Sequence, residues 1–237
     1  MAARCREVDR RLRAQWGEAL HSVYIRGSLA KGRAVAGYSD LDSFGVLRAG
    51  VDEGDSGEWA RSLEAEIVQS FPIVAGVEFG IVPLEEIPDS TNIYAFIVKT
   101  EAACLYGESF AERLEPYRIT PDIAFQTQWF GRHLALFWRE YTDETEAERP
   151  DFIVWLMRRF LRLGMKLVMI GEERLTRDLY FCYESFAKHY PEQERSMYRA
   201  LELVINPEAG PETEGFIRHF GDWLERESER KLAAWAQ

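Results

Sequence analysis

Short apolar runs alternate with helical patterns in the first half of the chain. We expect strands at residues 21–26, 41–47 and 73–82, where apolar and β-branched residues gather between turn-forming residues. Apolar residues at helical spacing predict helices at residues 3–16 and 57–70. This alternation predicts a mixed α/β domain.

The pattern changes after Pro121, where long amphipathic stretches follow one another. The helices expected there span residues 122–141, 150–170, 176–189, 192–204 and 212–234. Predicted breaks fall at residues 142–148, Gly171, Pro191 and 206–211. Strands followed by a run of helices predict an α+β protein with two domains, at residues 1–115 and 116–237, the second an all-helical bundle.

The charge balance bears on the kind of partner. The 237 residues include 40 acidic and 29 basic side chains, which gives a net charge of −11. Nucleic-acid binding needs a basic stripe, so this balance argues against a nucleic-acid partner. It is compatible with a small cationic substrate, although an acidic surface also serves solubility.

The cysteine spacing and the hydropathy of the chain indicate the cellular compartment of the protein. Cys5, Cys104 and Cys182 lie far apart, and the absence of a Cys-x-x-Cys spacing argues against a zinc knuckle or a disulfide framework. The first residues lack the apolar run of a signal peptide. Charges interrupt the longest apolar stretches, as Arg158 and Lys166 do, so no membrane-spanning segment is expected. We therefore expect a cytoplasmic protein.

A Gly-Ser turn follows the first predicted strand. Gly27 and Ser28 should open a short helix, and the backbone N–H groups at a helix start attract anions. The Ser28 hydroxyl could donate to a phosphate oxygen, and Lys31 and Arg33 could neutralise a triphosphate. The alternative is an ordinary turn with Ser28 as a helix cap.

Two carboxylates stand at the head of the second predicted strand. Asp40 and Asp42 follow Ser28 after a gap of eleven residues. Residues i and i+2 of a strand share a face, so the two carboxylates should converge, as a hard cation such as Mg²⁺ requires. Asp42 also lies within the strand, where aspartate is disfavoured unless a cation or strong donors satisfy it. Plain turn chemistry with solvated aspartates is the alternative.

A third carboxylate interrupts the third predicted strand. Glu78 stands in the middle of the apolar run 74–82, on the face opposite its apolar neighbours. If this strand lies beside the one that carries Asp40 and Asp42, three carboxylates cluster. Glu78 could then bind metal or accept a proton from an attacking hydroxyl. The alternative is a single exposed glutamate on an edge strand.

The combination of these motifs resembles the DNA polymerase β-type nucleotidyltransferase superfamily. The matching positions are Gly27, Ser28, Asp40, Asp42 and Glu78. The resemblance covers about residues 20–110 and includes the segment 103–108, which is similar to the one that closes such domains. It implies an N-terminal nucleotidyltransferase domain with a mixed sheet, and Mg²⁺-dependent transfer of a nucleoside monophosphate from a nucleoside triphosphate with release of pyrophosphate.

The glutamate at the third position, together with a helical second half, is similar to the aminoglycoside adenylyltransferases. That resemblance implies Mg²⁺ held by Asp40, Asp42 and Glu78, ATP as co-substrate, and a small hydroxyl-bearing acceptor such as an aminoglycoside-like antibiotic. It also implies that Glu78 is the base that activates the acceptor hydroxyl. Lys31 stands where the family more often has arginine.

Two other functions remain open at this point. One is nucleotidylation of a protein or tRNA in a toxin–antitoxin-like system. The helical partners in such systems often carry an Arg, then four to six other residues, and then a His, and no histidine of this chain has that arrangement. The other is non-catalytic nucleotide binding, against which the retention of three carboxylates argues. The sequence is compatible with a monomer or a homodimer.

Overall fold

The protein is described by a computed structural model that covers residues 2–35, 39–48, 56–70, 76–88, 93–116, 119–121 and 130–236. The chain divides into two compact units, Met1–Tyr117 and Arg118–Gln237. The first combines a mixed sheet with helices and the described part of the second is helical, which confirms the predicted α+β class. That the units are separate domains with a boundary between residues 115 and 116 stays a prediction.

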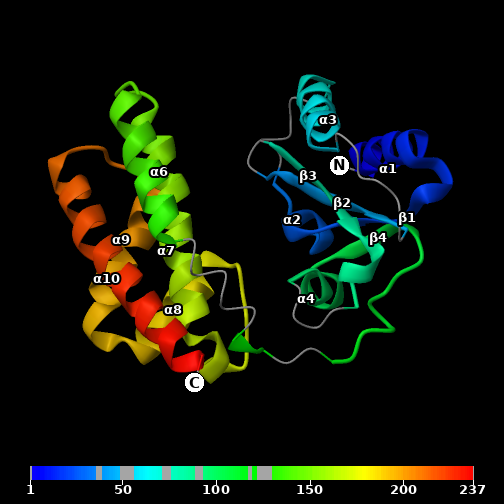
Figure 1. Ribbon diagram of the computed structural model, residues 1–237. Coiled ribbons are helices and arrows are strands. Elements are labelled where there is room, and N and C mark those ends of the chain that lie inside the picture. Colours follow the sequence, from blue (N-terminus) through cyan, green and yellow to red (C-terminus); the bar gives the residue numbers. More distant parts are fainter. Residues whose placement is uncertain are drawn as a thin grey trace. The chain divides into compact units, whose positions relative to one another are not determined.

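A four-stranded mixed sheet forms the centre of the first unit (Figure 1). Its strands are β1 (Leu20–Ile25), β2 (Leu41–Leu47), β3 (Val77–Pro83) and β4 (Ala103–Gly107), in the order β3-β2-β1-β4. β1 is antiparallel to both β2 and β4, whereas β2 and β3 are parallel. The third predicted strand begins at Val77 rather than at residue 73, and residues 71–75 lie outside the described part of the chain.

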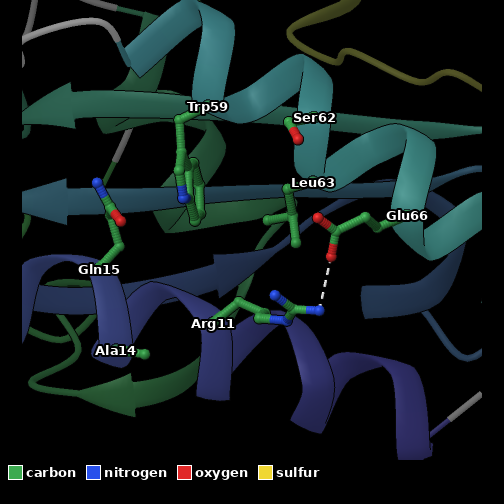
Figure 2. A pocket seen from close by; sticks show the side chains of 7 residues that line it. All are labelled: Arg11, Ala14, Gln15, Trp59, Ser62, Leu63 and Glu66. Atoms are coloured by element: carbon green, nitrogen blue, oxygen red, sulfur yellow. Dashed lines mark hydrogen bonds and ion pairs between the residues drawn. The ribbon is translucent and has the colours of Figure 1, made fainter.

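Helices cover both faces of this sheet. They are α1 (Ala2–Trp16), α2 (Gly27–Ala30), α3 (Ser56–Ser70) and α4 (Ile93–Thr100), with short 3₁₀ turns at Gly17–Ala19 and Leu84–Glu86. α1 and α3 lie on one side of the sheet (Figure 1). Leu12 of α1, Leu41 of β2 and Leu63 of α3 are buried in the same apolar cluster. On the outer side of this layer, Arg11 and Glu66 join α1 to α3 by an ion pair of 2.6 Å (Figure 2).

The opposite face of the sheet packs on α4. The ring of Phe44 in β2 contacts Tyr24 of β1 at 5.2 Å and Tyr94 of α4 at 5.5 Å between centroids. Because side chains alternate along a strand, Asp42 lies on the same face as Phe44. The carboxylate of β2 therefore belongs to the face that α4 covers. The sequence pattern did not predict α4.

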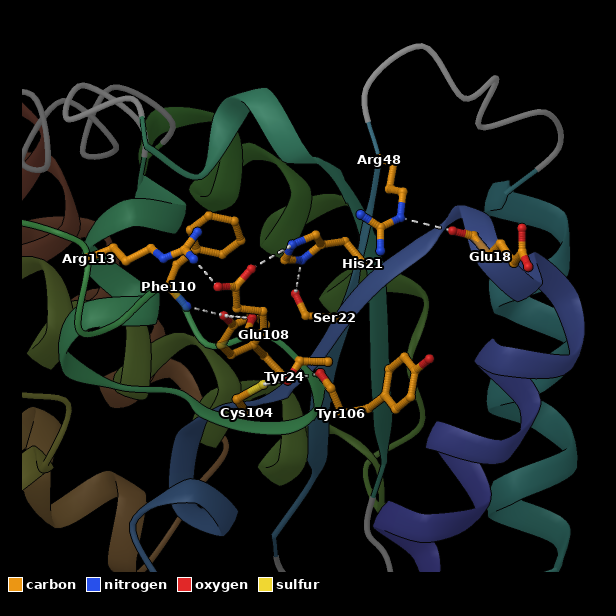
Figure 3. Close-up of polar contacts among 11 residues, drawn as sticks. Glu18, His21, Ser22, Tyr24, Arg48, Cys104, Tyr106, Glu108, Phe110 and Arg113 are labelled. Atoms are coloured by element: carbon orange, nitrogen blue, oxygen red, sulfur yellow. Dashed lines mark hydrogen bonds and ion pairs between the residues drawn. The ribbon is translucent and has the colours of Figure 1, made fainter.

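The segment after β4 is tied to β1 by polar contacts (Figure 3). The Tyr24 hydroxyl donates to the Glu108 carbonyl oxygen at 3.3 Å and accepts from the Phe110 N–H at 2.9 Å. His21 is buried, and its Nδ1 lies 3.1 Å from the Ser22 hydroxyl oxygen. Burial lowers the pKa of His21. These contacts hold the far edge of the sheet, away from β3.

The described part of the second unit is helical, as the sequence predicts. Its helices are α6 (Phe130–Asp143), α7 (Arg149–Glu172), α8 (Leu179–His189), α9 (Glu194–Ile205) and α10 (Pro211–Trp235), with a 3₁₀ turn at Pro191–Gln193. At its centre, the Phe220 ring contacts both Phe160 and Phe186. No helix among the described residues is long and apolar enough to cross a membrane.

The helix break predicted at Gly171 is present but falls two residues later. α7 continues to Glu172, and the chain turns at Glu173, which has a positive φ of 47°. A Cβ at position 171 would meet His189 Cε1 at 3.3 Å. The glycine thus admits a close approach of the end of α8, and α8 itself begins with Asp178 as its side-chain cap.

Candidate active site

The Gly-Ser turn and the second aspartate meet where β1 ends. The Arg26 N–H donates to the Asp42 carbonyl oxygen at 2.9 Å, and α2 begins at the next residue, Gly27. Gly27 has φ +70°, and a Cβ there would lie 2.7 Å from Asp42 Oδ2. Both the backbone conformation and the neighbouring carboxylate require glycine at this position. The structure thus places the Asp42 carboxylate directly against the start of α2.

Asp40 lies one residue before β2, beside the entrance to β3. The Leu41 N–H donates to the Gly76 carbonyl oxygen at 2.9 Å. A Cβ on Gly76 would lie 3.0 Å from Asp40 Oδ1, so the carboxylate packs against this glycine. Gly76 was not singled out from the sequence, and its contact with Asp40 depends on the pairing of two strands distant along the chain.

Glu78 is the neighbour of Asp42 across the parallel β2–β3 ladder. Paired residues in a ladder share a face, so both side chains lie on the α4 side of the sheet. The Glu78 side chain is 68% exposed and accepts a hydrogen bond from Arg26 Nη2 at 2.5 Å. Arg26 is a site residue that the sequence analysis did not assign.

The two predicted phosphate-binding cations have different surroundings. Lys31 Nζ donates to Glu101 Oε1 at 2.9 Å, and the Glu101 side chain is only 8% exposed. This ion pair connects the end of α2 to the end of α4. Arg33 is exposed, and its N–H donates to the Ser28 carbonyl oxygen at 2.8 Å. Lys31 therefore has a structural partner, while Arg33 lies on the surface next to the Gly-Ser turn.

The carboxylates of Asp40, Asp42 and Glu78 can be compared with the ligands that Mg²⁺ requires. Within the described ranges, no three His, Cys, Asp or Glu side chains lie close enough together to form a metal site. Mg²⁺ is nevertheless commonly held by one or two carboxylates together with substrate phosphates and water. Asp40 and Asp42 offer the hard oxygen donors of that smaller set, Asp40 from one residue before β2 and Asp42 from within it.

In the helical unit, positively charged side chains gather on α7. Arg159, Arg162 and Lys166 follow one another at helical spacing, and the Arg159 guanidinium lies 3.8 Å from the Trp155 ring centroid. Burial and the nearby Arg177 lower the pKa of Lys166 to about 8 and that of Arg162 to about 10. The buried Arg162 Nε has no hydrogen-bond partner in the described part of the chain. An anion near this helix would therefore be stabilised.

Comparison with known proteins supports the fold. No protein-family model matches the sequence, and a search of curated proteins gives no significant match. Among solved structures, the chain is similar to spectinomycin adenyltransferase AAD(9) from Enterococcus faecialis, whose crystal structure contains ATP and spectinomycin. The similarity covers 97% of this chain and 99% of that chain, with a TM-score of 0.61 and 14% sequence identity. The protein therefore has a nucleotidyltransferase-like fold.

Proposed function

We propose that the protein transfers a nucleoside monophosphate, AMP from ATP, to a hydroxyl group of a small molecule in a Mg²⁺-dependent reaction. The observation that carries the proposal is the Asp42 carboxylate, which packs against Gly27 while Glu78 lies beside it in register. The similarity to an adenyltransferase whose structure contains ATP and spectinomycin supports this class of reaction.

Each residue of the site would have a separate task. Asp40 and Asp42 would hold Mg²⁺, which when bound stabilises negative charge on the phosphate oxygens. Gly27 leaves room beside Asp42, and the Ser28 hydroxyl would donate to a phosphate oxygen. Arg33 would contribute positive charge at the surface of the turn.

The reaction is an in-line displacement at phosphorus. The oxygen of the acceptor hydroxyl forms a bond to the α-phosphorus while the bond to pyrophosphate breaks. The Glu78 carboxylate accepts the proton that the hydroxyl loses. Since little covalent chemistry falls to the protein, its residues act mainly by positioning the reactants and by neutralising charge.

Charge bears on the class of the acceptor. The net charge of −11 favours a cationic acceptor, such as an aminoglycoside-like antibiotic. A nucleoside triphosphate and a cationic, hydroxyl-bearing small molecule are therefore the proposed substrate pair.

The test is a labelling experiment with a panel of acceptors. The protein is incubated with Mg²⁺, ATP labelled at the α-phosphate, and aminoglycosides, spectinomycin or lincosamides. We expect label on one of these compounds and an equal amount of released pyrophosphate. Label on a protein or tRNA would favour nucleotidylation of a macromolecule, and ATP binding without pyrophosphate release would indicate a non-catalytic nucleotide-binding protein.

A further inference from the structure

Arg26 contacts both strands that carry the candidate catalytic carboxylates. Its backbone N–H donates to the Asp42 carbonyl oxygen at 2.9 Å, and its Nη2 donates to Glu78 Oε1 at 2.5 Å. It also immediately precedes Gly27, the glycine against which the Asp42 carboxylate packs. One residue therefore connects the end of β1 with Asp42 and Glu78.

The sheet order determines the path of the Arg26 side chain. β2 lies between β1 and β3, so a side chain that starts at the end of β1 and reaches Glu78 must cross β2. It crosses next to Asp42, because Asp42 and Glu78 are partners in the β2–β3 register. The guanidinium thus extends over the face of the sheet on which both carboxylates lie.

Among the described residues, no side chain other than Arg26 pairs with Glu78. It stands on β3, the edge strand of the described sheet, and its side chain is 68% exposed, whereas that of Arg26 is only 20% exposed. A glutamate in such a position loses considerable rotamer freedom when it is fixed in one orientation. A planar guanidinium that presents its donors in a rigid fork is well suited to fix it.

We infer that Arg26 is a positioning residue, which holds the Glu78 carboxylate beside Asp42 where it can accept the proton of the acceptor hydroxyl. The inference rests on the proposed function, because it assigns Glu78 the role of base. Arg26 acts only through Glu78, and its side chain does not contact the reacting atoms. A glutamate released from Arg26 would adopt the base position in only a fraction of its rotamers, and kcat would fall accordingly.

The experiment compares Arg26→Gln, Arg26→Lys, Glu78→Gln and the double variant Arg26→Gln/Glu78→Gln with the wild type. Measured quantities are kcat and KM for ATP in the labelling assay, ATP binding by calorimetric titration, and Tm. Arg11→Gln is the matched control, since it removes an arginine that pairs with Glu66 at 2.6 Å on the opposite face of the same sheet.

We expect Arg26→Gln to lower kcat by about 10- to 100-fold, the cost of a misplaced catalytic group. KM and Kd for ATP should change less than about threefold, and Arg26→Lys should restore part of the loss, because a lysine retains the charge but not the fork. The double variant should be no slower than Glu78→Gln, and Arg11→Gln should match the wild type.

Several results would overturn the inference. Equal kcat for Arg26→Gln and wild type would do so, as would a kcat effect of the same size in the Glu78→Gln background. A rise in KM for ATP with kcat unchanged would show that Arg26 binds nucleotide instead. Failure of the wild type to transfer label to any acceptor would refute the proposed function and the positioning role together, whereas the other results refute the positioning role alone.

Discussion

Replacing Gly27 by alanine introduces a methyl group at the point where α2 meets the Asp42 carboxylate. The new Cβ would lie 2.7 Å from Asp42 Oδ2, while ordinary contacts begin at 3.4 Å, so the carboxylate must move by about 0.7 Å. The same substitution forces alanine to adopt φ +70°, which costs about 1–2 kcal/mol. Gly27→Ala therefore combines backbone strain with displacement of a candidate metal ligand.

Gly32→Ala separates these two effects. Gly32 has a similar φ of +66°, but a Cβ there would have nothing within 4 Å. Both variants should lose roughly 1–2 kcal/mol of stability, which lowers Tm by on the order of 5–10 °C in a domain of this size. Only Gly27→Ala should also lose activity, by about 100-fold in kcat, because a displacement approaching 1 Å misplaces the catalytic groups.

The assay measures kcat for label transfer well below the Tm of either variant, so that both are fully folded. A kcat of Gly27→Ala equal to that of the wild type would contradict this prediction, because it would show that the position of the Asp42 carboxylate does not matter for turnover. If Gly32→Ala lost as much activity as Gly27→Ala, the backbone strain that both variants share would explain the loss, and displacement of the Asp42 carboxylate would not be needed.

Three further changes test other parts of the structure. Asp42→Asn should lower kcat by at least about 100-fold while circular dichroism and Tm stay close to wild type, and normal turnover would contradict the metal assignment. Lys31→Met should cost about 1–3 kcal/mol in denaturant unfolding because it leaves the buried Glu101 carboxylate without this partner, and Glu101→Gln added to it should recover part of the loss. Burial lowers the pKa of His21, so the unfolded chain binds this proton more readily, and stability should fall as pH drops below about 6.5; His21→Gln should make the Tm profile flatter there, and an unchanged slope would contradict it.

The sequence predicted those elements whose apolar pattern has a clear period. β2 also matches its predicted residues, because turn-forming residues precede its short apolar run. α4 was missed because residues 93–98 are continuously apolar, and a short apolar run has no period by which a helix and a strand can be told apart. The end of α7 was misplaced because Gly171 serves close packing with His189 rather than termination.

Some residues of the candidate site could be predicted from the sequence, and others could not. The sequence predicts Gly27, Ser28 and Asp42 as site residues, because glycine and serine form turns next to strands and aspartate is unusual within one. The contact of Gly76 with Asp40 and the ion pair of Arg26 with Glu78 could not be predicted, because they join residues that are distant along the chain and depend on the order of strands in the sheet. Phosphate binding by Lys31 stays a prediction, and the ion pair of Lys31 with Glu101 could not be predicted from the sequence, because it joins residues distant along the chain.

We propose that Asp42 of β2 and Glu78 of β3 support transfer of a nucleotidyl group to a small hydroxyl-bearing molecule. The most direct test of this proposal is mass spectrometry of spectinomycin and aminoglycosides after incubation with the protein, ATP and Mg²⁺, with Asp42→Asn as the control. We predict that one compound gains the mass of an adenylyl group only when wild-type protein and Mg²⁺ are both present. An unmodified panel together with undiminished ATP, or the same product from Asp42→Asn, would show that these carboxylates do not support nucleotidyl transfer.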